Sequence, residues 1–104
     1  QILAEEAAMK MIFVVYSRAA DYDVVAKLKS TGIKGYTKMK DVSGEGTDTE
    51  PKLGTHCWPG ENNALYIAAD DEEAARVCEV IRELKNSHPR AGVKGFILPM
   101  VEII

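Results

Sequence analysis

The sequence lacks a cysteine framework, a long apolar run and an excess of basic residues. It contains two cysteines in 104 residues, fewer than a short disulfide-held chain needs, so we expect both to be free thiols. The longest apolar stretch covers residues 11–16, far short of the roughly 20 residues that a membrane-spanning helix requires. With 13 basic and 16 acidic residues, the net charge of −3 disfavours a general affinity for nucleic acid, which depends on clustered Lys and Arg side chains.

What the sequence does contain indicates one globular domain. Hydrophobic residues make up 46% of the chain and charged residues 28%, a balance that favours a folded domain over a disordered segment. Residues 1–8 precede the first predicted strand and are interpreted as a terminal tail outside the domain at 9–104. The tail carries acidic residues where a signal peptide has basic ones, so we expect a cytoplasmic protein without direct membrane insertion.

Hydrophobic patterning predicts four strands and two helices. The β-branched and aromatic content places the strands at 10–17, 33–42, 63–69 and 94–103. The first helix is expected to have Asp21 as its N-cap and to be followed by Gly32 as its left-handed C-terminal stop, and the second to cover 70–87 with an acidic first turn. The order predicts an α+β, ferredoxin-like βαββαβ sandwich, with a four-stranded antiparallel sheet and both helices on one face. In this topology the last strand, with Pro99, lies at a sheet edge.

The predicted strands are apolar on both of their faces. In the first strand Phe13 points to one side, and its neighbours Ile12 and Val14 point to the other. Helices on one side only would leave the second apolar face open, and a face of that extent exceeds what monomers usually expose. We therefore predict that copies of the chain cover this face in a homo-oligomer.

Glycines beside two predicted strands suggest a ligand. Residues 43–62 form a long connection rich in Gly and Pro, and long loops in compact domains are usually functional. Gly44 and Gly46 in this loop allow the backbone to approach an anion closely and to offer it N–H groups. Gly92 precedes Lys94 at the start of the last strand, a second place that suits negative charge. Together these residues predict a small anionic ligand beside the sheet edge.

The long loop also contains His56, Cys57 and Trp58. A neighbouring His and Cys suit a soft metal, but two ligands do not complete a tetrahedral site, so other copies or His88 would have to add more. A Cys–His nucleophile pair is disfavoured, because adjacent side chains on an extended loop point apart. The first strand-to-helix connection is short and has no glycine, so we interpret Arg18 as a solvated strand-end residue rather than part of a phosphate cradle. These features favour a binding protein over an enzyme.

Several segments resemble the PII signal-transduction family. Gly-Ile-Lys-Gly-Tyr-Thr at 32–37, followed by Val-Ser-Gly-Glu-Gly at 42–46, looks like that family's second strand running into its T-loop. Residues 63–71 resemble its third strand, and Gly-Val-Lys at 92–94 resembles the B-loop that holds nucleotide phosphates. The resemblance implies a homotrimer with its sheets facing inward and adenine-nucleotide sites (ATP, ADP or AMP) in the clefts between subunits. It also implies that the T-loop, here 43–62, contacts a target protein such as a transporter or an enzyme.

The resemblance assigns roles to individual positions. It places Thr37 near the adenine, Gly44 and Gly46 at the base of the T-loop, and Lys94 opposite the phosphates after Gly92. Arg90 stands where the family's B-loop is richer in glycine, and its guanidinium can hold phosphate oxygens. The loop residues assigned to partner binding are His56, Trp58 and Asn62.

The loop differs from that of the family's nitrogen regulators. Residues 43–62 contain no tyrosine as a target for uridylylation, and Thr47 follows Gly46 where no counterpart exists for the Gln that helps hold Mg–ATP and 2-oxoglutarate. The resemblance is therefore to a divergent PII-like subgroup. Two alternatives stay open: a metal-responsive trimer similar to divalent-cation tolerance proteins, using His56 and Cys57, and a slow nucleotide-hydrolysing enzyme of the same fold.

Overall fold

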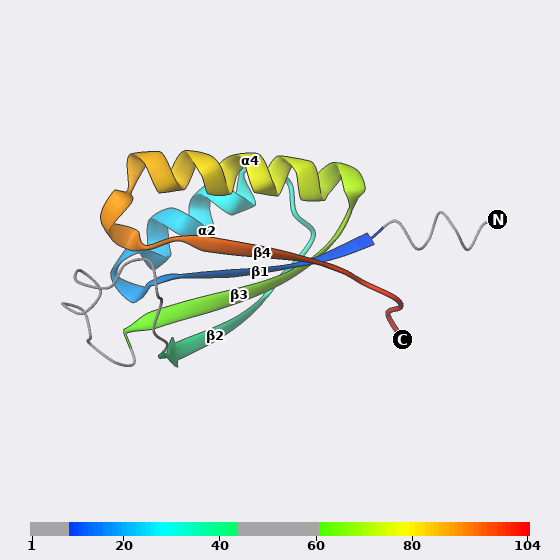
Figure 1. The fold of residues 1–104 in the computed structure, drawn as a ribbon, viewed down its shortest axis with the longest axis horizontal. Helices are drawn as coiled ribbons and strands as arrows, with labels where there is room; N and C mark the ends of the chain where they lie inside the picture. Colours follow the sequence, from blue (N-terminus) through cyan, green and yellow to red (C-terminus); the bar gives the residue numbers. More distant parts are fainter. Residues whose placement is uncertain (1–8, 44–60) are drawn as a thin grey trace.

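A computed structural model describes residues 9–43 and 61–104. Four strands form one antiparallel sheet in the order β2-β3-β1-β4, and both helices cover the same face of it (Figure 1). This confirms the predicted ferredoxin-like arrangement, with β4 at an edge. The elements are β1 (Met9–Ser17), η1 (Arg18–Ala20), α2 (Asp21–Lys29), β2 (Thr37–Val42), β3 (Asn62–Asp70), α4 (Asp71–Ser87), η2 (Pro89–Ala91) and β4 (Lys94–Pro99).

Most predicted boundaries lie within one residue of those in the structure, and three predictions are wrong. β2 begins at Thr37 rather than at 33, after a stretch that follows the left-handed Gly32 (φ 83°). β4 ends at Pro99 rather than at 103. Pro99 stands opposite Lys10 in the last pair with β1 and has no backbone N–H to donate, and the Met100 N–H after it still donates to the Met9 carbonyl (3.2 Å). Asp21 is the first residue of α2 and not its N-cap, because its carboxylate is hydrogen-bonded to side chains of other elements.

The core lies between the helices and one face of the sheet. Ile12, Val14 and Tyr16 alternate along β1 and are at most 1% exposed. Val77 and Leu84 of α4 pack into the same cluster, which confirms the apolar stripe predicted for this helix. The other face of β1 is left without a helix above it.

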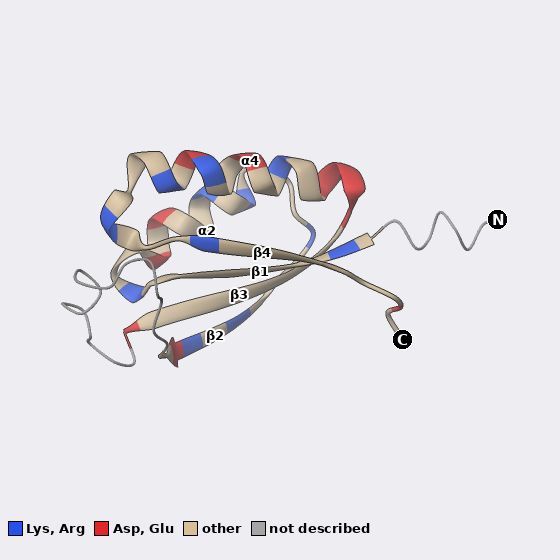
Figure 2. Ribbon diagram, in the orientation of Figure 1, with Lys and Arg blue, Asp and Glu red and all other residues tan. Residues whose placement is uncertain are grey.

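Helix α4 begins with a reciprocal cap. The Asp70 carboxylate accepts a hydrogen bond from the Glu73 backbone N–H (2.8 Å), and the Glu73 carboxylate accepts one from the Asp70 N–H (3.3 Å). Acidic residues fill the first turn (Figure 2), where they interact favourably with the positive end of the helix dipole. Within the described ranges, no helix combines the length and apolar character needed to cross a membrane.

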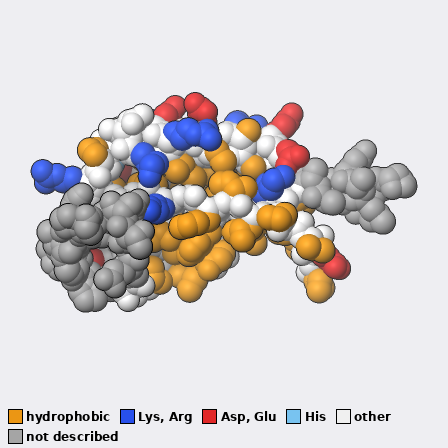
Figure 3. Space-filling model, in the orientation of Figure 1, with side chains coloured by type: hydrophobic (Ala, Val, Ile, Leu, Met, Phe, Trp, Pro, Cys, Tyr) orange, Lys and Arg blue, Asp and Glu red, His pale blue; other side chains and the backbone are white. Residues whose placement is uncertain are grey.

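The face of the sheet away from the helices is apolar and open. Phe13 of β1 lies between Tyr66 of β3 and Phe96 of β4, with ring centroids 4.7 and 5.7 Å apart. Phe96 and Leu98 remain 47% exposed, and apolar side chains gather along this side of the sheet in Figure 3. The prediction that the strands are apolar on both faces is therefore confirmed.

Candidate functional site

The predicted ligand-binding residues that the structure describes lie on the two opposite edges of the sheet. Lys94 begins β4 at one edge, after Arg90 in η2 and the left-handed Gly92 (φ 62°). Thr37 begins β2 at the other edge and stands opposite Tyr66 of β3. With β3 and β1 between them, about 14 Å of sheet separates the two edges at the usual strand spacing. One copy of the chain therefore does not bring Thr37 and Lys94 together.

The remaining predicted site residues fall mostly in the loop. Asn62 is described: it is the first residue of β3, half-buried, and stands opposite Val42 of β2. In the described ranges no three His, Cys, Asp or Glu side chains are grouped so that they could hold a metal ion, and Cys78 on α4 is a free, partly buried thiol. The predicted residues outside the described ranges are Gly44, Gly46, His56, Cys57 and Trp58.

Lys94 lines a positively charged depression along the β4 edge. This shallow depression of about 430 Å³ is also lined by Arg82 and Lys85, and none of the described residues that line it is acidic. Lys85 donates a hydrogen bond from Nζ to the Val93 carbonyl (2.8 Å), which ties the end of α4 to the turn before β4. Arg82 and Lys85 were not predicted as site residues, although their spacing of three on α4 places them on neighbouring positions of one helix face.

Arg90 lines a separate depression of about 400 Å³, together with Ser17, Asp23 and His88. His88 Nε2 lies 3.3 Å from the Asp23 carboxylate, so η2 is attached to the first turn of α2. The predicted phosphate ligands Arg90 and Lys94, which precede and follow Gly92 in the sequence, thus line two different depressions.

A polar cluster around Asp21 joins the first helix to three strands. The Asp21 carboxylate accepts hydrogen bonds from the Tyr16 hydroxyl (2.7 Å), Asn63 Nδ2 (3.0 Å) and Lys38 Nζ (2.7 Å). Burial opposes ionisation of this carboxyl, but these three donors outweigh it and lower the pKa of Asp21. Burial, reinforced by the bond to Asp21, raises the pKa of Tyr16, so its hydroxyl keeps the proton that it donates.

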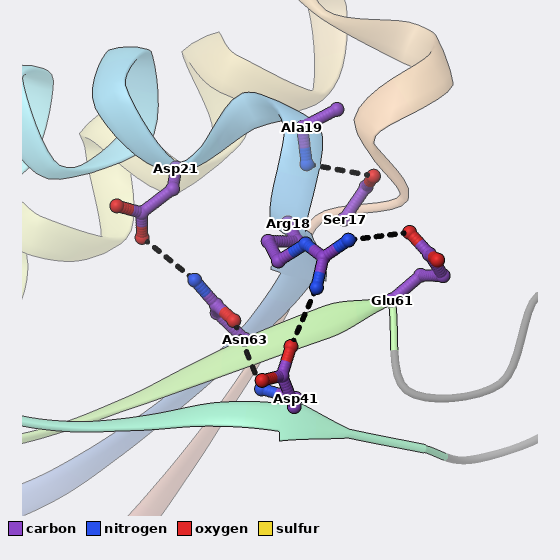
Figure 4. Close-up of polar contacts among 7 residues, drawn as sticks. All are labelled: Ser17, Arg18, Ala19, Asp21, Asp41, Glu61 and Asn63. Atoms are coloured by element: carbon purple, nitrogen blue, oxygen red, sulfur yellow. Dashed lines mark hydrogen bonds and ion pairs between the residues drawn. The ribbon is translucent and has the colours of Figure 1, made fainter.

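Arg18 connects the two strand ends that flank the 43–62 loop. Its guanidinium lies 2.7 Å from the Asp41 carboxylate at the end of β2 and 3.3 Å from the Glu61 carboxylate just before β3. Its backbone N–H also donates to the Glu61 carbonyl (2.6 Å). The two side-chain contacts are drawn in Figure 4. Arg18 is exposed directly after β1, as predicted for a solvated residue at the strand end, and the structure adds that both ends of the loop bring a carboxylate within its reach.

The family model for nitrogen regulatory protein P-II matches residues 9–104. The chain belongs to the P-II family. A search of curated protein sequences gives no match. Family membership confirms the resemblance that the sequence predicted.

Solved structures of PII-like proteins share the fold of this P-II family chain. A proposed PII-like signaling protein from Thermus thermophilus has a TM-score of 0.65 and 24% identity, covering 88% of this chain and 85% of its own. CPII from Thiomonas intermedia K12, bound to ADP, AMP and acetate, has a TM-score of 0.68 and 16% identity over 88% and 85%. A functionally unknown protein from Pediococcus pentosaceus has a TM-score of 0.67 and 14% identity over 94% and 97%. At these identities the likeness concerns the fold.

Proposed function

We propose that this P-II family member is a non-enzymatic regulatory sensor. It binds an adenine nucleotide in the clefts between the subunits of a homotrimer and regulates a partner protein through its 43–62 loop. The observation that supports this best is the placement of Thr37 and Lys94 on opposite edges of the sheet. When the β4 edge of one copy meets the β2 edge of the next, both residues line one cleft, and the site is complete only in the assembly.

The open apolar face supports the trimer. Phe13, Tyr66 and Phe96 lie together on the side of the sheet that has no helix. Packing three sheets with these faces inward removes the patch from water, which is the dominant favourable term in association. The same packing leaves both edges at the outside of the assembly, where neighbouring copies form the clefts.

The charge of the β4 edge supports a phosphate-bearing ligand. In the proposed cleft Lys94 contacts the phosphates, and Arg82 and Lys85 extend the positive surface beside it. Arg90, two positions before Gly92, is a second phosphate partner from the other depression. CPII, a nitrogen regulatory PII-like protein with this fold, is known bound to ADP, AMP and bicarbonate, which favours adenine nucleotides as the first ligands to test.

The other proposed contacts come from the second copy and from the loop. Thr37 contacts the adenine from the β2 edge, and Gly44 and Gly46 form the base of the loop. The segment with His56, Trp58 and Asn62 then meets the partner protein. Binding selects one arrangement of the loop, and that arrangement docks on the partner or releases it.

Calorimetric titration with ATP, ADP and AMP, each with and without Mg²⁺, tests the proposal. We expect saturable binding near one site per chain for at least one nucleotide. Lys94→Ala weakens that binding by about tenfold or more, which corresponds to about 1.4 kcal/mol. Lys29→Ala is the matched control, because Lys29 is an exposed lysine at the C-terminal end of α2 and lines neither depression. Absence of heat with all three nucleotides, or a Lys94→Ala variant that binds as tightly as the wild type, contradicts the proposal.

A further inference from the structure

β2 contains a one-residue bulge just before it enters the 43–62 loop. Met39 stands opposite Ala64 of β3, but Val42 stands opposite Asn62, one residue out of the register set by the earlier pairs. Lys40 and Asp41 therefore share the single opposite residue Asn63, and the backbone of Asp41 is left-handed (φ 55°). Residues with a side chain adopt this conformation only occasionally, although Asp tolerates it better than most. The bulge therefore needs contacts that hold Asp41 in place.

Two side chains supply those contacts. The Asp41 backbone N–H donates to Asn63 Oδ1 (3.2 Å), and its carboxylate accepts from Arg18 Nη1 (2.7 Å). Asn63 is only 3% exposed, and its Nδ2 is bonded to Asp21. Arg18 reaches Glu61 with its other amino group, so the guanidinium bridges the strand ends on both sides of the loop (Figure 4).

We propose that Arg18 is a positioning residue that holds the bulge at Asp41 and so sets the register in which β2 delivers the chain into the loop. A slip of one residue moves every following side chain to the opposite face of a strand. Without the guanidinium, Asp41 returns to an extended conformation and Val42 moves opposite Glu61. The chain then leaves β2 toward the opposite face of the sheet, and we expect the nucleotide to bind more weakly. The expected loss of nucleotide binding rests on the proposed nucleotide site.

Glycine separates positioning from direct ligand contact. Because glycine adopts a left-handed backbone without a steric penalty, Asp41→Gly keeps the bulge without help from Arg18. The double variant Arg18→Gln/Asp41→Gly therefore regains the wild-type register and nucleotide affinity although the guanidinium is missing. A residue that itself contacted the phosphates could not be replaced in this way.

Nuclear magnetic resonance of the full chain without ligand tests the register directly. Cross-strand contacts link Val42 to Asn62 in the wild type, and we expect Arg18→Gln to link Val42 to Glu61 instead. The double variant returns to the Val42–Asn62 contact. Arg76→Gln, which removes an arginine on α4 that donates to the Thr31 carbonyl, serves as the control and leaves the register unchanged. An Arg18→Gln variant that keeps the Val42–Asn62 contact overturns the inference.

Calorimetry on the same variants tests the consequence for binding. With ATP or ADP as the probe, we expect Arg18→Gln to lose about tenfold in affinity and the double variant to recover it. Recovery of the register without recovery of affinity would show that Arg18 contacts the ligand itself and would overturn its positioning role. If the wild type binds no nucleotide, the proposed function fails, and the register comparison alone decides the inference.

Discussion

Phe96 provides a quantitative test of the proposed trimer. It is 47% exposed in the single chain and lies beside Phe13 on the open face of the sheet. A phenylalanine presents about 200 Å² of surface, so roughly 95 Å² of Phe96 is left for another copy to cover. At about 25 cal/mol per Å², this burial is worth about 2.4 kcal/mol per copy. Phe96→Ser in a trimer that buries the open face therefore loses about 7 kcal/mol of association free energy, or about five orders of magnitude in the association constant.

Sedimentation equilibrium at micromolar concentration measures this loss. We expect a trimeric wild type and a monomeric Phe96→Ser, with circular dichroism confirming that the variant stays folded. Tyr22→Ser is the matched control, because Tyr22 is an aromatic residue, 82% exposed, of helix α2. This helix covers the opposite face of the sheet (Figure 1). A monomeric wild type, or a Phe96→Ser variant that still associates as tightly, would refute the reasoning that another copy covers this face.

Three further substitutions test the fold around the site. Asp21→Asn lowers the free energy of unfolding by about 1–3 kcal/mol near neutral pH, because an ammonium group loses its carboxylate. Since the pKa of Asp21 is lowered in the folded state, the extra stability of the wild type over Asp21→Asn is fully present above the usual carboxyl pKa of about 4. It disappears as the pH falls through the folded-state pKa. Urea titrations between neutral and acid pH measure this stability difference, and a difference that stays constant with pH would contradict the role of Asp21. Gly32→Ala lowers the free energy of unfolding by about 1–2 kcal/mol, because the φ of +83° at Gly32 disfavours a side chain even where space is open. Gly35→Ala, at an equally unobstructed position, is the control and lowers the stability less in thermal unfolding. Equal losses of stability in the two variants would refute the argument. Gly95→Val lowers the free energy of unfolding by about 1–3 kcal/mol and Gly95→Ala lowers it less, because an added Cβ lies 2.9 Å from the movable Cδ1 of Ile81. A Gly95→Val variant with wild-type stability in urea would contradict this close packing.

Local patterns predicted the fold well because they depend on near neighbours in the sequence. The helical spacing of Val77 and Leu84 predicted the buried stripe of α4, and Gly32 predicted the left-handed residue after α2. The strand ends were harder to predict, because the end of β4 depends on which of its residues pair with β1. Strand pairing is a property of the tertiary structure that no short window contains.

The candidate site was only partly predictable for the same reason. Gly92 and Lys94 are neighbours in the sequence, and their proximity to the sheet edge follows from the turn that contains them. Arg18 meets Asp41 and Glu61 across separations of 23 and 43 residues, and the chain has many other carboxylates that it could have met. Only the folded sheet selects these two.

The short edges of the sheet also limit how copies of the chain can join. The two edges of the sheet are different strands, β2 and β4, of six residues each. When β2 of one copy meets β4 of another, the interface joins two different surfaces, so the assembly either closes into a ring or grows into a fibre. The bulge at Asp41 bends the end of β2, and Pro99, which has no N–H to donate, ends β4. Both edges are therefore poor templates for a continuous intermolecular sheet. The bulge at the base of the loop therefore also disfavours edge-to-edge pairing of β2 with another chain.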